Sequence, residues 1–150
     1  MWWQLCYHSD MKAVIDTNIF LGACLGTGIT GKVIAASLEG RFQPLMGAAL
    51  LAEHEDVLGR QALFARCRLS AEERENLFDI YLSKCEWIRV YYTWRPNLPD
   101  EADNHLVELA IAGGADAIVT RNLRDLTRME LRFPSLRIVS PDVFLKEVLK

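Results

Sequence analysis

The chain has 150 residues, enough for one domain with a buried core, and we expect no second domain. Hydrophobic residues make up 51% and charged residues 25% of it, which excludes the composition of a disordered protein. The formal net charge of −3 argues against a protein that coats nucleic acid by bulk electrostatics, although a local basic patch around an acidic, metal-neutralised centre remains compatible with it.

The chain carries no strong targeting or redox signal. Its cysteines are scattered without a C-x-x-C pair, so we expect reduced thiols that serve as packing groups. No apolar stretch approaches the roughly 18 to 20 residues of a membrane span, and the first ten residues lack the basic start and apolar core of a signal peptide. We therefore expect a cytoplasmic protein.

Residues 1–11 are rich in Trp and end at a second methionine, Met11. We interpret them as an N-terminal extension that is dispensable for activity, and we place the domain at residues 12–150.

The first predicted strand, Ala13-Val14-Ile15, is apolar and β-branched without a helical period, as in a buried parallel strand. Asp16 follows it directly. In open α/β sheets ligands bind beyond the carboxyl ends of the strands, so a carboxylate there points to chemistry. The alternative is that Asp16 is a turn or N-cap residue of the next helix.

A short helix is predicted over residues 18–25, capped by Thr17 or Asn18, followed by a break over 26–31 and a helix from Lys32 to Leu38. The break resembles a phosphate-binding loop, but Val33 stands where the magnesium-binding hydroxyl belongs. We therefore favour a simple connection between two helices.

Residues 42–46 predict a second strand, and residues 48–58 an amphipathic helix. Glu53 and Glu55 fall on opposite borders of its apolar stripe, so the helical wheel alone cannot say which acid faces a site. His54 lies inside the stripe, where a packed, hydrogen-bonded histidine is the better interpretation than a metal ligand.

Ser70 to Glu73 matches a capping box for a helix to about Lys84, and residues 86–91 predict a third strand. We expect three side chains of this helix to face inward: Leu77, Ile80 and Tyr81.

The next helix is predicted over residues 100–112, ended by Gly113-Gly114. Asp103 falls near the middle of its apolar face, where an acid is costly. It is either the partner of an Asp100 cap or a carboxylate that points toward a cation in the crevice of the sheet.

Two more strands are predicted at residues 116–120 and 136–140, and a closing helix at 141–149, with Ser140 as its cap and Pro141 at its first position. Strands and helices alternate along the chain. This alternation predicts a doubly wound parallel α/β sheet with helices on both faces.

The predicted topology gathers three acids at one crevice: Asp16, one of Glu53 or Glu55, and Asp103. A fourth polar group comes from Asn122 or Asp125, after the fourth strand. Clustered carboxylates stay ionised together when a divalent cation neutralises them, and ligands of this kind suit Mg²⁺ or Mn²⁺.

From Lys12 to about Leu149 the chain resembles the PIN-domain ribonucleases, particularly the VapC-like toxins of toxin–antitoxin pairs. The resemblance is carried by four stretches in order: VIDTN (14–18), LLAEHEDVL (50–58), DEADNHLVELAIAGGADAIVTRNLRDL (100–126) and ELRFPSLRIVSPDVFL (130–145). It implies a three-layer α/β/α sandwich with a central parallel sheet of four to five strands.

The resemblance also implies a site. Asp16, Glu53 and Asp103 would hold Mg²⁺ or Mn²⁺, since Glu53 and not Glu55 matches the acid position of the family. Asn122 departs from the usual fourth aspartate, and Asp125 is the alternative catalytic acid.

The implied activity is metal-dependent hydrolysis of RNA phosphodiesters. Thr17, Asn18, Thr120 and Asn122 would orient the ligands or the water. Three arginines near helical spacing form a candidate contact strip for the RNA backbone, with a solvated helix face as the alternative: Arg121, Arg124 and Arg128. An antitoxin partner and a homodimer are further expectations from the resemblance.

Two other functions compete with this interpretation. One is an inactive PIN-like domain that binds RNA or a protein, suggested by Asn122. The other is a phosphotransferase of the haloacid-dehalogenase type, which needs a second acid at the position of Asn18.

Overall fold

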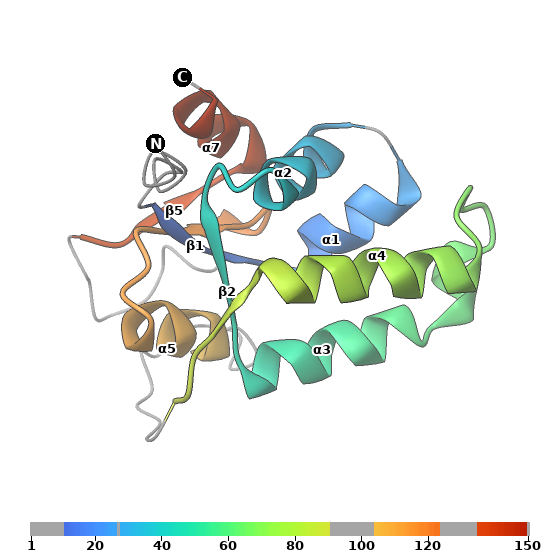
Figure 1. Ribbon diagram of the computed structural model, residues 1–150, viewed down its shortest axis with the longest axis horizontal. Helices are drawn as coiled ribbons and strands as arrows, with labels where there is room; N and C mark the ends of the chain where they lie inside the picture. Colours follow the sequence, from blue (N-terminus) through green and yellow to red (C-terminus); the bar gives the residue numbers. More distant parts are fainter. Residues whose placement is uncertain (1–10, 27, 91–103, 124–134, 150) are drawn as a thin grey trace, which may run out of the picture.

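The computed structural model describes residues 11–26, 28–90, 104–123 and 135–149. Figure 1 shows the elements of these ranges in chain order: β1 (Lys12–Ile15), α1 (Thr17–Leu25), α2 (Ile29–Leu38), β2 (Gln43–Met46), α3 (Ala48–Leu58), the 3-10 helix η2 (Gln61–Phe64), α4 (Ala71–Lys84), β3 (Glu86–Trp87), α5 (Asn104–Ala112), β4 (Ala117–Val119), β5 (Arg137–Val139) and α7 (Pro141–Val148).

The strands form one parallel sheet in the order β3-β2-β1-β4-β5. The chain adds strands on one side of β1 first and then on the other, so the order reverses between β1 and β4. Such a reversal leaves a crevice at the carboxyl ends of the two strands. The predicted parallel sheet is thus confirmed, and its reversal point marks where to look for a site.

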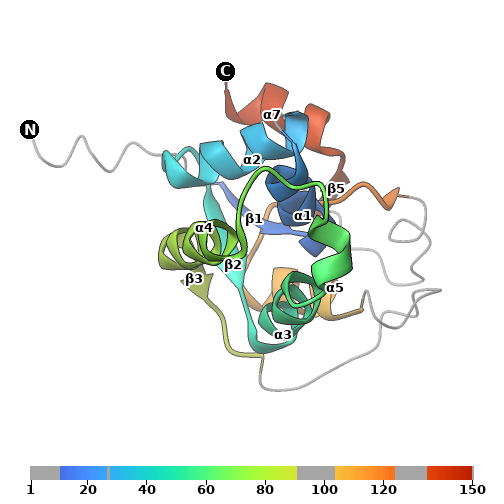
Figure 2. The same cartoon turned by 90° about the vertical axis from the view of Figure 1, so that its right-hand side faces the viewer.

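Helices cover both faces of this sheet. On one face, α2 contacts α1, α4 and α7, and on the other α5 contacts β1, β2 and β4 (Figures 1 and 2). The central strands β1, β2 and β4 are almost fully buried, with Val14, Leu45 and Ile118 at 0% exposure. The doubly wound, layered arrangement predicted from the alternation is confirmed.

The helix α4 begins with the predicted capping box, in which Ser70 and Glu73 exchange hydrogen bonds between side chain and backbone. Its inward face differs from the prediction. Tyr81 is fully buried and Leu77 packs half-buried against the core, as predicted, but Ile80 is 50% exposed and Phe78 takes the inward position instead. Phe78 and Tyr81 both pack against the ring of Phe20 from α1, and this tertiary contact sets the rotation of the helix.

The start of α1 corrects a prediction. The helix begins at Thr17 with Asp16 at its N-cap, and Thr17 and Asn18 do not cap it. The reason is that β1 passes into the helix without a loop, so the last extended residue is Asp16.

The helix α2 begins at Ile29 instead of Lys32, so Gly31 and Lys32 lie inside it. The stretch that resembles a phosphate-binding loop is therefore largely helical. The preference for a connection between two helices is correct, but this connection is shorter than predicted.

Two later predictions are only partly covered. Of the strand predicted over residues 86–91, the structure assigns Glu86–Trp87 to β3, which pairs with β2, and the Ile88 N–H donates to the Met46 carbonyl at 2.9 Å. Of the helix predicted over 100–112, the structure describes Asn104–Ala112; the preceding residues lie outside the described ranges. Its end at the predicted glycines is confirmed, with Gly114 at a φ of 66° that favours glycine.

Within the described ranges, no single helix is long and apolar enough to cross a membrane. The helices α1 and α2 reach the necessary length and composition only as a pair bent by 106°.

Candidate active site

Asp16 lies at the reversal point of the sheet and is only 5% exposed. Although it occupies the N-cap of α1, its side chain makes no capping hydrogen bond. Instead the Thr120 hydroxyl, which follows β4, donates to Asp16 Oδ2 at 2.8 Å. The same hydroxyl oxygen accepts the backbone N–H of Asn122 at 3.0 Å. Asp16 is thus held across the carboxyl ends of β1 and β4.

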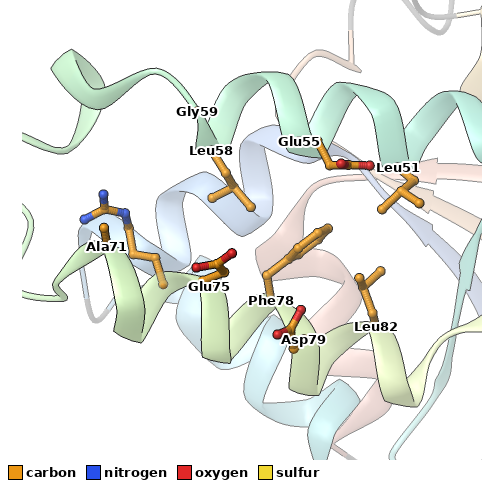
Figure 3. A pocket seen from close by; sticks show the side chains of 10 residues that line it. Leu51, Glu55, Leu58, Gly59, Ala71, Glu75, Phe78, Asp79 and Leu82 are labelled. Atoms are coloured by element: carbon orange, nitrogen blue, oxygen red, sulfur yellow. The ribbon is translucent and has the colours of Figure 1, made fainter.

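Glu53, in the middle of α3, reaches toward α5. His105 Nε2 donates a hydrogen bond to Glu53 Oε2 at 2.8 Å. Glu55 points elsewhere: it lines a groove of about 530 Å³ between α3 and α4, together with Glu75 and Asp79 (Figure 3). The structure therefore places Glu53, and not Glu55, on the side of α3 that faces His105.

Asp16 and Glu53 are near enough for the charge of Glu53 to affect the pKa of Asp16. Burial raises the pKa of the Asp16 carboxyl above its ordinary value, the Thr120 hydrogen bond opposes this rise, and the negative charge of Glu53 adds to it. The hydrogen bond from His105 lowers the pKa of Glu53, although burial partly opposes the effect. At neutral pH Glu53 is therefore ionised and faces a second carboxyl group.

The other predicted site residues divide into described and undescribed ones. Thr17 is buried next to Asp16, Asn18 and Arg121 are exposed, and Asn122 is half-buried. Four lie outside the described residues: Asp103, Arg124, Asp125 and Arg128.

The donors present suit a hard divalent cation. Asp16 and Glu53 offer carboxylate oxygens, which Mg²⁺ and Mn²⁺ prefer. Two more oxygens, Thr17 Oγ1 and Asn104 Oδ1, are buried. The Thr17 hydroxyl helps to lower the pKa of Glu53, whereas Asn104 Oδ1 has no hydrogen-bond partner among the described residues. The part of the chain that the structure describes contains no group of three or more acidic, histidine or cysteine residues able to hold a metal, and the third acid implied by the family resemblance, Asp103, lies outside it.

His105 is a site residue that sequence reasoning missed. It is a polar residue in the first turn of a mostly apolar helix, two positions after Asp103, and that was the available signal. The contact with Glu53 depends on the packing of α3 against α5, which no local pattern reveals.

His54 is fully buried, and its ring packs against Phe20, Phe78 and Tyr81. Burial lowers the pKa of His54 to about 4, so the ring is neutral at pH 7. The packed interpretation is confirmed. The expected hydrogen bond is not found, since neither ring nitrogen has a partner within the described residues.

Comparisons with known proteins agree with this architecture. The family model described as PIN domain matches residues 12–124. No curated protein matches the chain. Solved structures also share the fold at low sequence identity, among them the following two. The crystal structure of VapBC2 from Rickettsia felis, bound to a DNA fragment from its promoter, has a TM-score of 0.60 and 19% identity over 87% of this chain and 98% of that one. The crystal structure of PAE2754 from Pyrobaculum aerophilum has a TM-score of 0.59 and 11% identity over 97% of this chain and 95% of that one.

The family match covers most of the chain, including β1, Asp16, Glu53, His105 and Thr120. It confirms the resemblance described from the sequence and the three-layer α/β fold that the resemblance implies. The chain belongs to the PIN domain family.

Proposed function

We propose that the protein is a Mg²⁺- or Mn²⁺-dependent endoribonuclease and the toxin of a toxin–antitoxin pair. The observation that supports the proposal is that Asp16 lies at the reversal point of a PIN-domain sheet, with Glu53 near enough for its charge to raise the pKa of Asp16. A crevice at this position is where open α/β sheets bind ligands.

Asp16 and Glu53, with Asp103, would hold the metal ion. When bound, such an ion supplies a water of lowered pKa and stabilises the negative charge that develops on the phosphate. The fourth polar position would be filled by Asn122 or Asp125.

The chain's own residues would orient these ligands. Thr120 donates to one oxygen of Asp16 and His105 to one oxygen of Glu53, and these hydrogen bonds would orient the two carboxylates toward the cation. Thr17 and Asn18, at the start of α1, are candidates to orient the water. Three arginines would contact the RNA backbone: Arg121, Arg124 and Arg128.

The antitoxin and the homodimer belong to the same proposal. The structural match to VapBC2, named as a complex bound to promoter DNA, supports a protein partner for this fold. A cytoplasmic location is consistent with an RNA substrate.

The test is cleavage of single-stranded RNA by the purified protein, with and without Mg²⁺ or Mn²⁺. We expect Asp16→Asn, Glu53→Gln and Asp103→Asn to lose cleavage at least a hundredfold. Glu55→Gln is the matched control, because this acid lies in the groove between α3 and α4. If the first three variants cleaved as well as the wild type, the site assignment would be wrong.

A catalytically inactive RNA-binding or protein-interaction domain is the second candidate. It is favoured by Asn122, an amide at the position where the family usually has an acid. Tight RNA binding without cleavage across Mg²⁺ and Mn²⁺ titrations would support this candidate against the nuclease.

A further inference from the structure

We propose that a second cavity, beside the acid pair, binds one unpaired nucleobase of the RNA next to the phosphodiester that is cleaved. This inference rests on the proposed function for its substrate class. The cavity, called here the base pocket, lies between the first turn of α3, residues 87–90 and α5, and has a volume of about 490 Å³.

The base pocket opens at the same edge of the sheet as the acid pair. Gly47 follows β2, and Ile88 follows β3, so the carboxyl ends of these strands form one of its sides. His105 lines the pocket and also holds Glu53. Ala49, another lining residue, lies four residues before Glu53 on α3, which is about 6 Å along the helix axis. A strand of RNA with a phosphate at the acid pair would therefore place a neighbouring base at this pocket.

The lining has the chemistry of a stacking site. Trp87 is 52% exposed and Val90 39% exposed, although both line the pocket, so apolar surface remains open to a ligand. Leu50 and Leu109 form a buried apolar floor. Single-stranded RNA is commonly bound by stacking bases on aromatic side chains.

The charges that line the base pocket favour RNA binding more than those that line the groove between α3 and α4. Among the described residues, the lining of the base pocket includes the exposed cation Arg89, the imidazole of His105 and one carboxylate, Glu108. The groove instead carries three carboxylates, Glu55, Glu75 and Asp79, against the single cation Arg74 (Figure 3). A phosphate backbone is repelled by such a cluster, whereas Arg89 can attract it.

The size of the cavity limits what it accepts. A volume of about 490 Å³ falls in the range of small-ligand sites and admits a single nucleotide, not a duplex. The base must be splayed out of its stack, so we expect single-stranded RNA to be bound in preference to double-stranded RNA of the same sequence.

The experiment measures binding without cleavage. Fluorescent oligoribonucleotides are titrated by anisotropy with the full chain in Ca²⁺ in place of Mg²⁺ at fixed salt, and gel electrophoresis of each sample checks that the probe is intact. We expect Trp87→Ala to raise the Kd by about five- to hundredfold, as for loss of one stacked base. Trp87→Phe should retain most of the affinity. Ile80→Ala is the control, since Ile80 is exposed to a similar degree, 50%, on α4.

A second readout is photocrosslinking. RNA that carries one 4-thiouridine should crosslink to residues 87–90, as mapped by mass spectrometry. If Trp87→Ala bound RNA as tightly as the wild type, the proposal that the base pocket binds a nucleobase would be wrong, even if that variant bound a protein partner more weakly. The proposed function fails separately: binding that depends on Trp87 without any cleavage would keep the base pocket and reject the nuclease.

Discussion

His105 Nε2 lies 2.8 Å from Glu53 Oε2, and this hydrogen bond joins α5 to α3 beside the reversal point of the sheet. A residue that hydrogen-bonds to a metal ligand fixes the orientation of that ligand. Removal of such a residue commonly lowers metal affinity or activity tenfold to a hundredfold. We expect His105→Ala to weaken Mg²⁺-dependent RNA cleavage by about that factor, mainly through a higher Mg²⁺ concentration for half-maximal rate.

His105→Gln keeps a donor near the same place and should recover part of the affinity for Mg²⁺. A merely structural role would instead lower the free energy of unfolding in both variants without a shift in the Mg²⁺ titration. Equal Mg²⁺ titrations for His105→Ala and the wild type would refute the positioning role.

The Thr120 hydroxyl is the next target, because it donates to the buried Asp16 carboxyl. Thr120→Val keeps the shape but leaves a buried acceptor without its donor, which costs about 1–3 kcal/mol of unfolding free energy. Burial already raises the pKa of Asp16, and loss of the hydroxyl should raise it further. Because the Thr120 hydrogen bond lowers the pKa of Asp16, it favours the ionised carboxyl, and its loss should cost more stability at pH 7 than near pH 3.

Urea unfolding in EDTA at both pH values measures this difference. Thr120→Ser retains the hydroxyl and is the matched control. We expect it to lower the free energy of unfolding by a smaller amount that does not depend on pH. A Thr120→Val loss of equal size at pH 3 and pH 7 would show that the hydroxyl acts through packing alone.

The fold followed from the sequence where local pattern and tertiary packing agree. The strands β1, β2, β4 and β5 are short apolar runs, and each was predicted to within about a residue at either end. The capping box at Ser70 marks its helix unambiguously because it satisfies backbone groups locally. The start of α2 has no such signal: its N-cap is Gly28, and Gly31 sits inside the helix.

The site was harder to predict, because its contacts join distant elements. A helical wheel treats Glu53 and Glu55 alike, and the choice between them is made by the packing of α3 against α5 on one side and α4 on the other. For the same reason His105 was missed. Asp16 was predictable, since its position after a buried strand follows from the sequence alone, but its hydrogen bond to Thr120 depends on β1 pairing with β4.

Two cysteines should be chemically inert in the folded protein. Burial raises the pKa of the Cys24 thiol to about 11 and that of Cys85 to about 12, and only the thiolate reacts with alkylating agents. We expect neither residue to be modified by iodoacetamide at pH 7.5 in the native protein, and both to be modified in urea. Peptide mass spectrometry measures the modified fraction at each site, and rapid native labelling of Cys24 would contradict the burial of α1 in the core.

His54 should make the protein less stable in mild acid. Burial lowers its pKa to about 4 from an ordinary value of 6.5. Between these two pH values His54 is therefore protonated in the unfolded chain and neutral in the folded chain. Stability is complete above about pH 6.5 and falls as the pH decreases toward 4, by up to about 3 kcal/mol. Glu53, whose pKa is lowered from 4.5, acts in the same direction only at still lower pH.

The measurement is the free energy of unfolding in urea between pH 4.5 and 7.5 for the wild type and His54→Leu. The substitution removes the titrating group and two buried nitrogens that have no hydrogen-bond partner within the described ranges, while it keeps a side chain able to pack against Phe20 and Phe78. We expect the unfolding free energy of His54→Leu to vary less with pH than that of the wild type, and the variant to be at least as stable as the wild type at pH 5. If the unfolding free energies of the variant and the wild type depended on pH in the same way, His54 would have the same pKa in the folded and unfolded chains. That result would contradict the lowered pKa expected for a ring enclosed by aromatic side chains.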